Sequence, residues 1–191
     1  MRAKNAFRSA LAVSALALIG TSVPGQAVAA ADTTSHAAPA AAVVQADDLT
    51  FASQASKSAR SIVSANPKAA ARAATVCGAG YTQILTAKRL PNDSTRYATV
   101  YVYTDGSTTG PRIYDRPTCG VLHNETGSAQ YMGIRLKDNY TDTPHDEDFG
   151  TFSTYAGPVR QKKGYCGEVY SYMKKGGRVV IDNVSSVGTC N

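Results

Sequence analysis

Cysteine is the residue type whose chemistry is best defined in this 191-residue chain. The four cysteines, none of which has the C-x-x-C spacing typical of zinc and redox sites, are Cys77, Cys119, Cys166 and Cys190. We therefore expect two disulfides, each contributing about 3–4 kcal/mol to stability on the chain-entropy model. Pairs that are close in sequence suit neighbouring strands, so we expect Cys77 to bond Cys119 and Cys166 to bond Cys190, with the other two connectivities left open.

Histidine, glutamate and arginine side chains could carry acid–base chemistry. A small secreted ribonuclease needs a glutamate base, a histidine acid and an arginine that stabilises the transition state. The candidates for these roles are Glu125 or Glu168, His123 or His145, and Arg135. Their spacing gives no reason to group them, and the chain lacks a G-x-S-x-G nucleophile motif. We expect no catalytic activity, and a small secreted hydrolase such as a ribonuclease is the second alternative.

An acidic segment at 142–148 could offer several carboxylate oxygens to a hard cation. The acidic residues are Asp142, Asp146, Glu147 and Asp148. They lack the alternate-residue ligands and the central glycine of an EF-hand loop. We therefore expect a solvated acidic turn, with no metal and no cofactor bound to the protein.

Tyrosines are the candidates for a binding surface, because aromatic platforms often hold sugar rings or protein partners. Tyr97, Tyr101 and Tyr103 share one face of a predicted strand and form the candidate binding face. Tyr170 and Tyr172 share one face of another strand. Residues 77–191 contain no tryptophan and two phenylalanines, so tyrosines must also fill the core, and packing is the preferred interpretation.

The elements that must position these residues are strands. Residues 130–138 alternate with Met132, Ile134 and Leu136 on one face, and residues 97–104 alternate in the same way. Further strands are predicted at 81–86, 111–115, 119–124 and 151–159, and a hairpin is predicted from 164–174 and 178–184 around Lys175-Gly176-Gly177. No helical run follows Cys77. We expect an all-β fold, a small antiparallel β-sandwich or barrel of about eight short strands with two disulfides.

The first 29 residues have the pattern of a secretory signal peptide. A basic start precedes an apolar run at 10–19, and Ala27 and Ala29 form an A-x-A cleavage site. The apolar run is about half the length that a membrane-spanning helix needs, so we expect no membrane span in the mature form.

Residues 30–76 differ in composition from the rest of the chain. They contain 17 alanines in 47 positions and no tyrosine or cysteine, which predicts a flexible tether or a removable pro-segment. Helical spacing from Asp48 to Asn66 indicates one short helix, which would be stable only if it docked on the body. The chain thus divides into a signal peptide, this tether and a disulfide-bonded β domain at 77–191.

The net charge argues against an electrostatic nucleic-acid binder. Of the formal charge of +6, +4 lies in residues 1–76 and only +2 in residues 77–191. A nucleic-acid-binding domain would concentrate lysine and arginine on its folded part. We therefore expect no nucleic-acid partner.

Several segments of the body carry a family resemblance. They are Cys77-Gly-x-Gly-Tyr81, Thr99-Val-Tyr-Val-Tyr103, Tyr155-Ala-Gly-Pro-Val159, Gly164-Tyr-Cys166 and the near-terminal Cys190. Together they resemble the spore-associated protein A family of filamentous actinobacteria over most of residues 77–191, and the segment at 155–159 is the most specific. The resemblance implies a small secreted protein of the spore surface with no established enzymatic activity.

We therefore expect a secreted structural or adhesive protein of the cell or spore surface, without catalytic activity. Its expected partners are cell-wall or spore-surface polymers or proteins. The first alternative is a cell-wall polysaccharide-binding module or a protein inhibitor.

Overall fold

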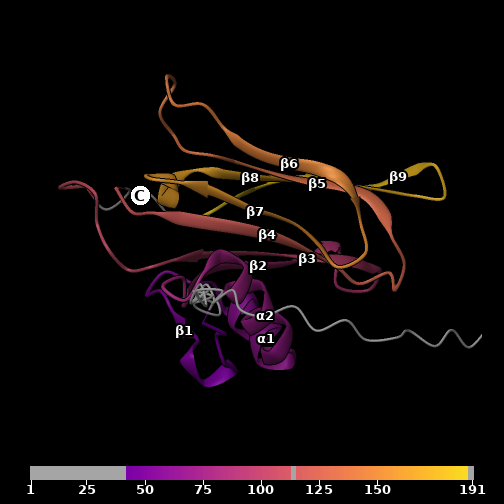
Figure 1. Cartoon of the computed structure of the whole chain (residues 1–191), viewed down its shortest axis with the longest axis horizontal. Helices are drawn as coiled ribbons and strands as arrows, with labels where there is room; N and C mark the ends of the chain where they lie inside the picture. The colour runs from indigo at the N-terminus through magenta and orange to yellow at the C-terminus, as the bar shows by residue number, and fades with distance from the viewer. Residues whose placement is uncertain (1–41, 113–114, 189–191) are drawn as a thin grey trace, which may run out of the picture. The chain divides into compact units, whose positions relative to one another are not determined.

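The computed structural model describes residues 42–112 and 115–188, in which nine strands form two sheets (Figure 1). The strands are β1 (Thr50–Phe51), β2 (Gln83–Pro91), β3 (Arg96–Thr104), β4 (Thr118–Asn124), β5 (Gln130–Lys137), β6 (Asp146–Phe152), β7 (Tyr155–Gln161), β8 (Glu168–Lys175) and β9 (Arg178–Ser186). The first sheet has the order β1-β2-β3-β4-β7 and the second β6-β5-β8-β9. Every pairing except β1 with β2 is antiparallel, so the predicted β fold is confirmed.

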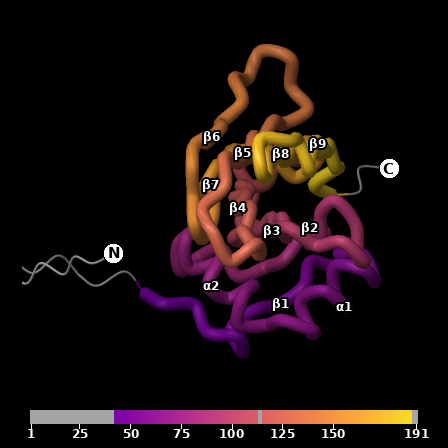
Figure 2. Tube along the Cα trace, turned by 90° about the vertical axis from the view of Figure 1, so that its right-hand side faces the viewer, coloured from indigo at the N-terminus to yellow at the C-terminus, as the bar shows by residue number. Residues whose placement is uncertain are grey.

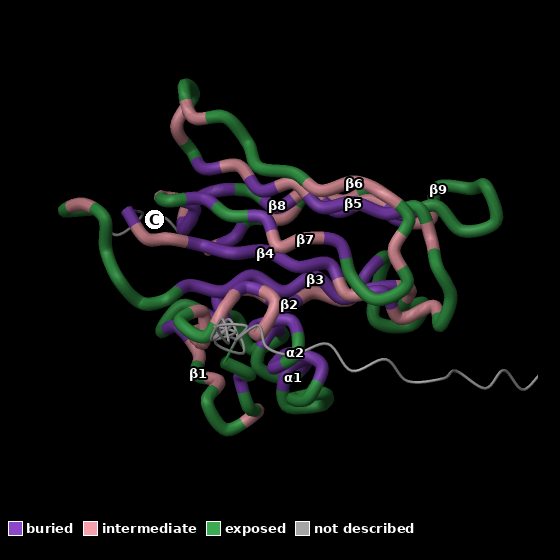
Figure 3. The backbone as a smooth tube through the Cα atoms, viewed as in Figure 1, coloured by how far each residue is buried: buried purple, intermediate pink, exposed green. Residues whose placement is uncertain are grey.

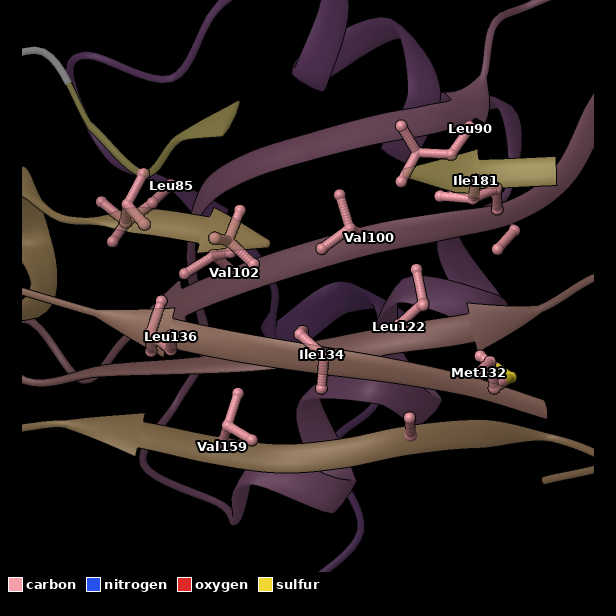
Figure 4. Close-up of a cluster of buried hydrophobic side chains, with 14 of the residues drawn as sticks. Leu85, Leu90, Val100, Val102, Leu122, Met132, Ile134, Leu136, Val159 and Ile181 are labelled. Carbon is pink, nitrogen blue, oxygen red and sulfur yellow. The ribbon is translucent and has the colours of Figure 1, made fainter. Parts of the chain in front are cut away.

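The main core lies between the two sheets. Alternate residues of β3 and β5, including Val100, Val102 and Ile134, point into it and are fully buried, as the period-two pattern predicts (Figure 4). Gly120 of β4 lies opposite Ile134, and a Cβ at Gly120 would be 3.1 Å from the Ile134 Cδ1 atom. The two sheets can therefore approach closely at this point.

Two helices cover the other face of the first sheet (Figure 2). They are α1 (Lys57–Ala65) and α2 (Pro67–Cys77), and 3₁₀ turns lie at Ala46–Asp48 and Gly164–Cys166. Ser56 caps α1 by accepting a hydrogen bond from the Ala59 N–H at 3.0 Å, and Asn66 caps α2 just before a proline at its first position. The predicted flexible tether is therefore wrong for residues 42–76. The predicted short helix is present and docked as α1, but it covers only residues 57–65 of the predicted range, because Thr50 and Phe51 form β1. A second helix accompanies it.

A second core lies between α2 and the first sheet. The buried face of α2 consists of small residues, among them Ala70, Ala73 and Ala74, so the helix lies close to the rings of Tyr101 and Tyr103. These two rings stack with centroids 6.3 Å apart, and both tyrosines are at most 1% exposed. Figure 3 shows β3 buried along most of its length, because it is covered on both faces.

The candidate binding face predicted at Tyr97, Tyr101 and Tyr103 is therefore wrong. Tyr101 and Tyr103 are core residues under α2. Tyr97, at the start of β3, packs against the core between the sheets and has the Lys175 Nζ atom 5.3 Å from its ring centroid. Alternation correctly placed Tyr101 and Tyr103 on one face, but it could not show that a helix covers that face.

One predicted disulfide is described by the structure. Cys77, at the end of α2, is bonded to Cys119 of β4, with 5.9 Å between their Cα atoms. Cys166 is not free, but its predicted partner Cys190 lies outside the described residues. The structure thus describes one disulfide where the sequence predicts two.

Two strand predictions need correction. The segment at 151–159 is not one strand: it spans the turn between β6, which joins the second sheet, and β7, which joins the first. The strand predicted at 111–115 is absent from residues 111, 112 and 115, and residues 113–114 lie outside the described part. The hairpin predicted around Gly176-Gly177 is confirmed, and both glycines have the positive φ that this tight turn needs.

The segment at 155–159, which is the most specific part of the family resemblance, forms β7. The pairing of β7 with β4 is irregular here, and Gly157 adopts a φ of 101°. A Cβ at Gly157 would lie 2.8 Å from the carbonyl oxygen of Gly120, so both the backbone conformation and the space require glycine. This gives the segment a structural role.

The predictions for the N-terminal segment concern residues that the structure largely does not describe. The signal peptide predicted at residues 1–29 is not among the described residues. Within the described ranges, no helix is long and apolar enough to cross a membrane.

The buried tyrosines make stability sensitive to alkaline pH. Burial, followed by the nearby Glu125 carboxylate, raises the pKa of Tyr101 to about 12 from 10.0. The stabilisation is complete below pH 10 and is lost as the pH rises to about 12, because the unfolded chain releases this proton first. We expect the free energy of unfolding to fall by about 2–3 kcal/mol over this range through Tyr101 alone. Urea titrations at several pH values would measure it.

Tyr101→Phe is the matched control, because it removes the ionisable hydroxyl and keeps the ring. We expect this variant to lose less stability than the wild type between pH 10 and 12. An equal loss in both proteins would contradict the assignment.

Candidate binding face

Four aromatic side chains lie on the outer face of the second sheet. Tyr131 comes from β5, Phe149 from β6, and Tyr170 and Tyr172 from β8. They alternate with residues of the main core such as Met132 and so must point away from it. We call Tyr131, Phe149, Tyr170 and Tyr172 the aromatic face.

The four rings form a connected row. The ring centroid of Tyr172 lies 6.3 Å from that of Tyr131, 6.4 Å from that of Tyr170 and 6.5 Å from that of Phe149. The rings are not coplanar: the interplanar angle is 84° between Tyr131 and Tyr172 and 31° between Phe149 and Tyr170. Tyr131 is 46% exposed, and the other three are half-buried. The face is therefore a continuous but contoured apolar surface.

A glycine under the row makes room for it. Gly133 of β5 pairs with Phe149 on one side and with Tyr172 on the other. A Cβ at Gly133 would lie 2.0 Å from the Phe149 Cδ1 atom. The Phe149 ring therefore lies directly over Gly133, and a larger residue there would displace it.

Cationic groups flank the row. The Arg135 Cζ atom lies 5.8 Å from the Phe149 ring centroid and 5.6 Å from that of Tyr170, and the Lys174 Nζ atom lies 5.8 Å from that of Tyr131. Arg135 also binds Glu147, with 2.6 Å between Nε and Oε2. The hydrogen bond from Arg135 is the main cause that lowers the pKa of Glu147. Arg135 is thus held in place from two sides.

One end of the row opens into a depression with a volume of about 600 Å³. Its lining combines charged and hydrogen-bonding groups with one aliphatic side chain, and the residues are Arg135, Lys137, His145, Glu168, Tyr170 and Val184. Burial, followed by a hydrogen bond to Asp182, raises the pKa of Tyr170. The depression therefore places donors and acceptors beside the apolar row.

The residues considered for acid–base chemistry fall into two separate groups. Arg135, His145 and Glu168 line the depression. His123 and Glu125 lie close together at the end of β4, in the other sheet. The sequence therefore suggested suitable residues but could not show which of them meet.

The acidic segment has a structural role. Asp146 accepts a hydrogen bond from the Arg160 N–H at 2.6 Å, and Asp148 accepts one from the Gly157 N–H at 2.7 Å. These carboxylates therefore join β6 to β7. Among the described residues, no group of three or more potential metal ligands is found.

No family model, no curated protein and no solved structure matches the chain. The fold and the aromatic face are therefore the basis for assigning a function. The resemblance to the spore-associated protein A family stays a prediction from the motifs.

Proposed function

We propose that the protein is a non-catalytic adhesive protein that binds polysaccharide chains of a cell or spore surface through the aromatic face. The observation that carries this proposal is the row of four aromatic rings on the outside of a sheet whose other side is a packed core. The proposal joins the adhesive role expected from the sequence to the first alternative, a polysaccharide-binding module.

The chemistry of the face suits sugar rings. The C–H faces of a sugar ring are apolar and pack on aromatic rings, while its hydroxyls need hydrogen-bond partners. The aromatic face offers the rings, and the adjoining depression offers the guanidinium of Arg135, the carboxylate of Glu168 and the hydroxyl of Tyr170. Tyrosine also loses little side-chain freedom on binding, which favours affinity.

The angles between the rings favour one physical form of the ligand. A flat crystalline polymer surface would require coplanar rings, whereas Tyr131 is nearly perpendicular to Tyr172. A single chain can turn its successive sugar units to follow such a contour. We therefore expect binding to amorphous or soluble glycan chains, such as those of peptidoglycan, in preference to crystalline chitin.

Tyr172→Ala tests the proposal, because the ring of Tyr172 is the one that lies next to all three other rings of the aromatic face. Losing a central aromatic contact costs about 2 kcal/mol of binding, so we expect retention on peptidoglycan to weaken about 30-fold. Gly133→Ala should also weaken it, because the added methyl group displaces Phe149. Pull-down on purified peptidoglycan at increasing protein concentration would measure both changes.

Tyr140→Ala is the matched control. Tyr140 is a half-buried tyrosine outside the aromatic face, and its hydroxyl donates to Asp115 at 3.1 Å. We expect this variant to be retained like the wild type. Equal retention of all variants, or no retention of the wild type on any glycan, would contradict the proposal. Far-UV circular dichroism would verify that each variant is folded.

A further inference from the structure

A histidine and a glutamate lie close together on the first sheet, on the side that carries the helices. The His123 Nδ1 atom is buried and lies 3.8 Å from Glu125 Oε1, and it has no hydrogen-bond partner among the described residues. Glu125 Oε1 also accepts a hydrogen bond from the Thr99 hydroxyl at 2.9 Å, and Glu125 Oε2 contacts Arg96. The carboxylate is thus held from β3 and faces the imidazole of β4.

The surroundings keep Glu125 ionised. Burial raises its pKa, but the neighbouring His123, the hydrogen bond from Thr99 and the positive charge of Arg96 outweigh this effect, so the net pKa is lowered. The ionised carboxylate faces the Nδ1 side of the imidazole at 3.8 Å.

His123 forms part of the wall of a hollow with a volume of about 270 Å³. Its polar lining includes the exposed guanidinium of Arg72 on α2 and the hydroxyl of Tyr155 on β7. Val43, Ala73 and Val76 supply an apolar wall. Among the described residues, no carboxylate lines the hollow.

We propose that this hollow binds the phosphate group of a phosphate monoester that carries an apolar body. The guanidinium of Arg72 presents paired N–H donors that match phosphate oxygens, and His123 offers a second donor in its imidazolium form, in which both ring nitrogens carry a proton. The apolar wall then receives the organic part of the ligand. The site is independent of the aromatic face and of the function proposed for it.

Phenyl phosphate is the probe, because it joins one phosphate to one apolar ring. We expect saturable binding to the full folded protein. The shift of the His123 ring proton in NMR spectra and calorimetry would both measure it. Inorganic phosphate should bind more weakly, and phenol should not compete. Arg72→Gln and His123→Gln should each weaken phenyl phosphate about tenfold, since each removes one charge-assisted hydrogen bond.

Lys68→Gln is the matched control, because Lys68 is an exposed cation of the same helix that does not line the hollow. It should bind phenyl phosphate like the wild type, and so should Tyr172→Ala, which separates this site from the aromatic face. The proposal is overturned if phenyl phosphate does not saturate, if phenol binds equally well, or if Lys68→Gln weakens binding as much as Arg72→Gln. Arg72 is exposed, so its variant tests the site even if His123→Gln fails to fold.

Discussion

Replacing Cys77 and Cys119 together with alanine is expected to lower the free energy of unfolding by about 4 kcal/mol. The bond closes a loop across a sequence separation of 42 residues, and opening it gives the unfolded chain many more conformations. Both residues are at most 2% exposed in an apolar cluster, so alanine avoids burying a new hydroxyl. Urea unfolding without reductant, compared with the wild type, would measure the loss.

The same titration contains its own control. Loss of the cross-link should make the unfolded state more expanded, so the dependence of the free energy on urea should become steeper. The single variant Cys77→Ala also lacks the bond and should be about as unstable as the double variant. A loss below about 1 kcal/mol would mean that the bond hardly constrains the unfolded chain.

Tyr103→Ala is expected to destabilise the protein by about 3–5 kcal/mol, the usual cost of deleting a buried aromatic side chain. Tyr103 is fully buried, and its hydroxyl donates to the Ala70 carbonyl oxygen at 2.7 Å. The substitution would leave a cavity under α2, because the small residues of that helix cannot fill it. Thermal and urea unfolding would measure the change.

Tyr103→Phe separates packing from hydrogen bonding. It keeps the ring and removes one hydrogen bond, so we expect a loss of about 1 kcal/mol. Because Tyr103 lies in the core, this variant should also be retained on peptidoglycan like the wild type. Loss of retention by a stably folded Tyr103→Phe protein would restore the binding role that the sequence suggests for this residue.

The strands of this fold could be predicted because their apolar residues have a period of two. Val100 and Ile134 point into the main core as alternation requires. The turn at Gly176-Gly177 follows from the need for positive φ. The boundary between β6 and β7 cannot be predicted in this way, since alternation within a segment does not reveal that the chain moves from one sheet to the other.

The helical layer could be predicted only in part. Ala70, Ala73 and Ala74 form a buried, close-packed face of α2, yet an alanine-rich segment offers few bulky side chains that would predict a packed core. What stabilises α2 is contact with Tyr101 and Tyr103, which are distant in sequence. Propensity and composition contain no information about such a contact.

The candidate binding face shows the same limit. Its tyrosines could be placed on outward faces of β5 and β8 from alternation alone. Phe149 joins them only because β6 pairs with β5 so that Phe149 lies over Gly133. Pairing partners between strands are set by the whole fold, so the row could not be assembled from the sequence.

The docking of α1 and α2 on strands that come later in the chain also determines when these helices can form during synthesis. They contain 9 and 11 residues, and isolated helices of this length are marginal in water. Their partners on β3 and β4, and the Cys119 that fixes α2, leave the ribosome only afterwards. These helices therefore gain the contacts that stabilise them only after the strands on which they pack have been translated.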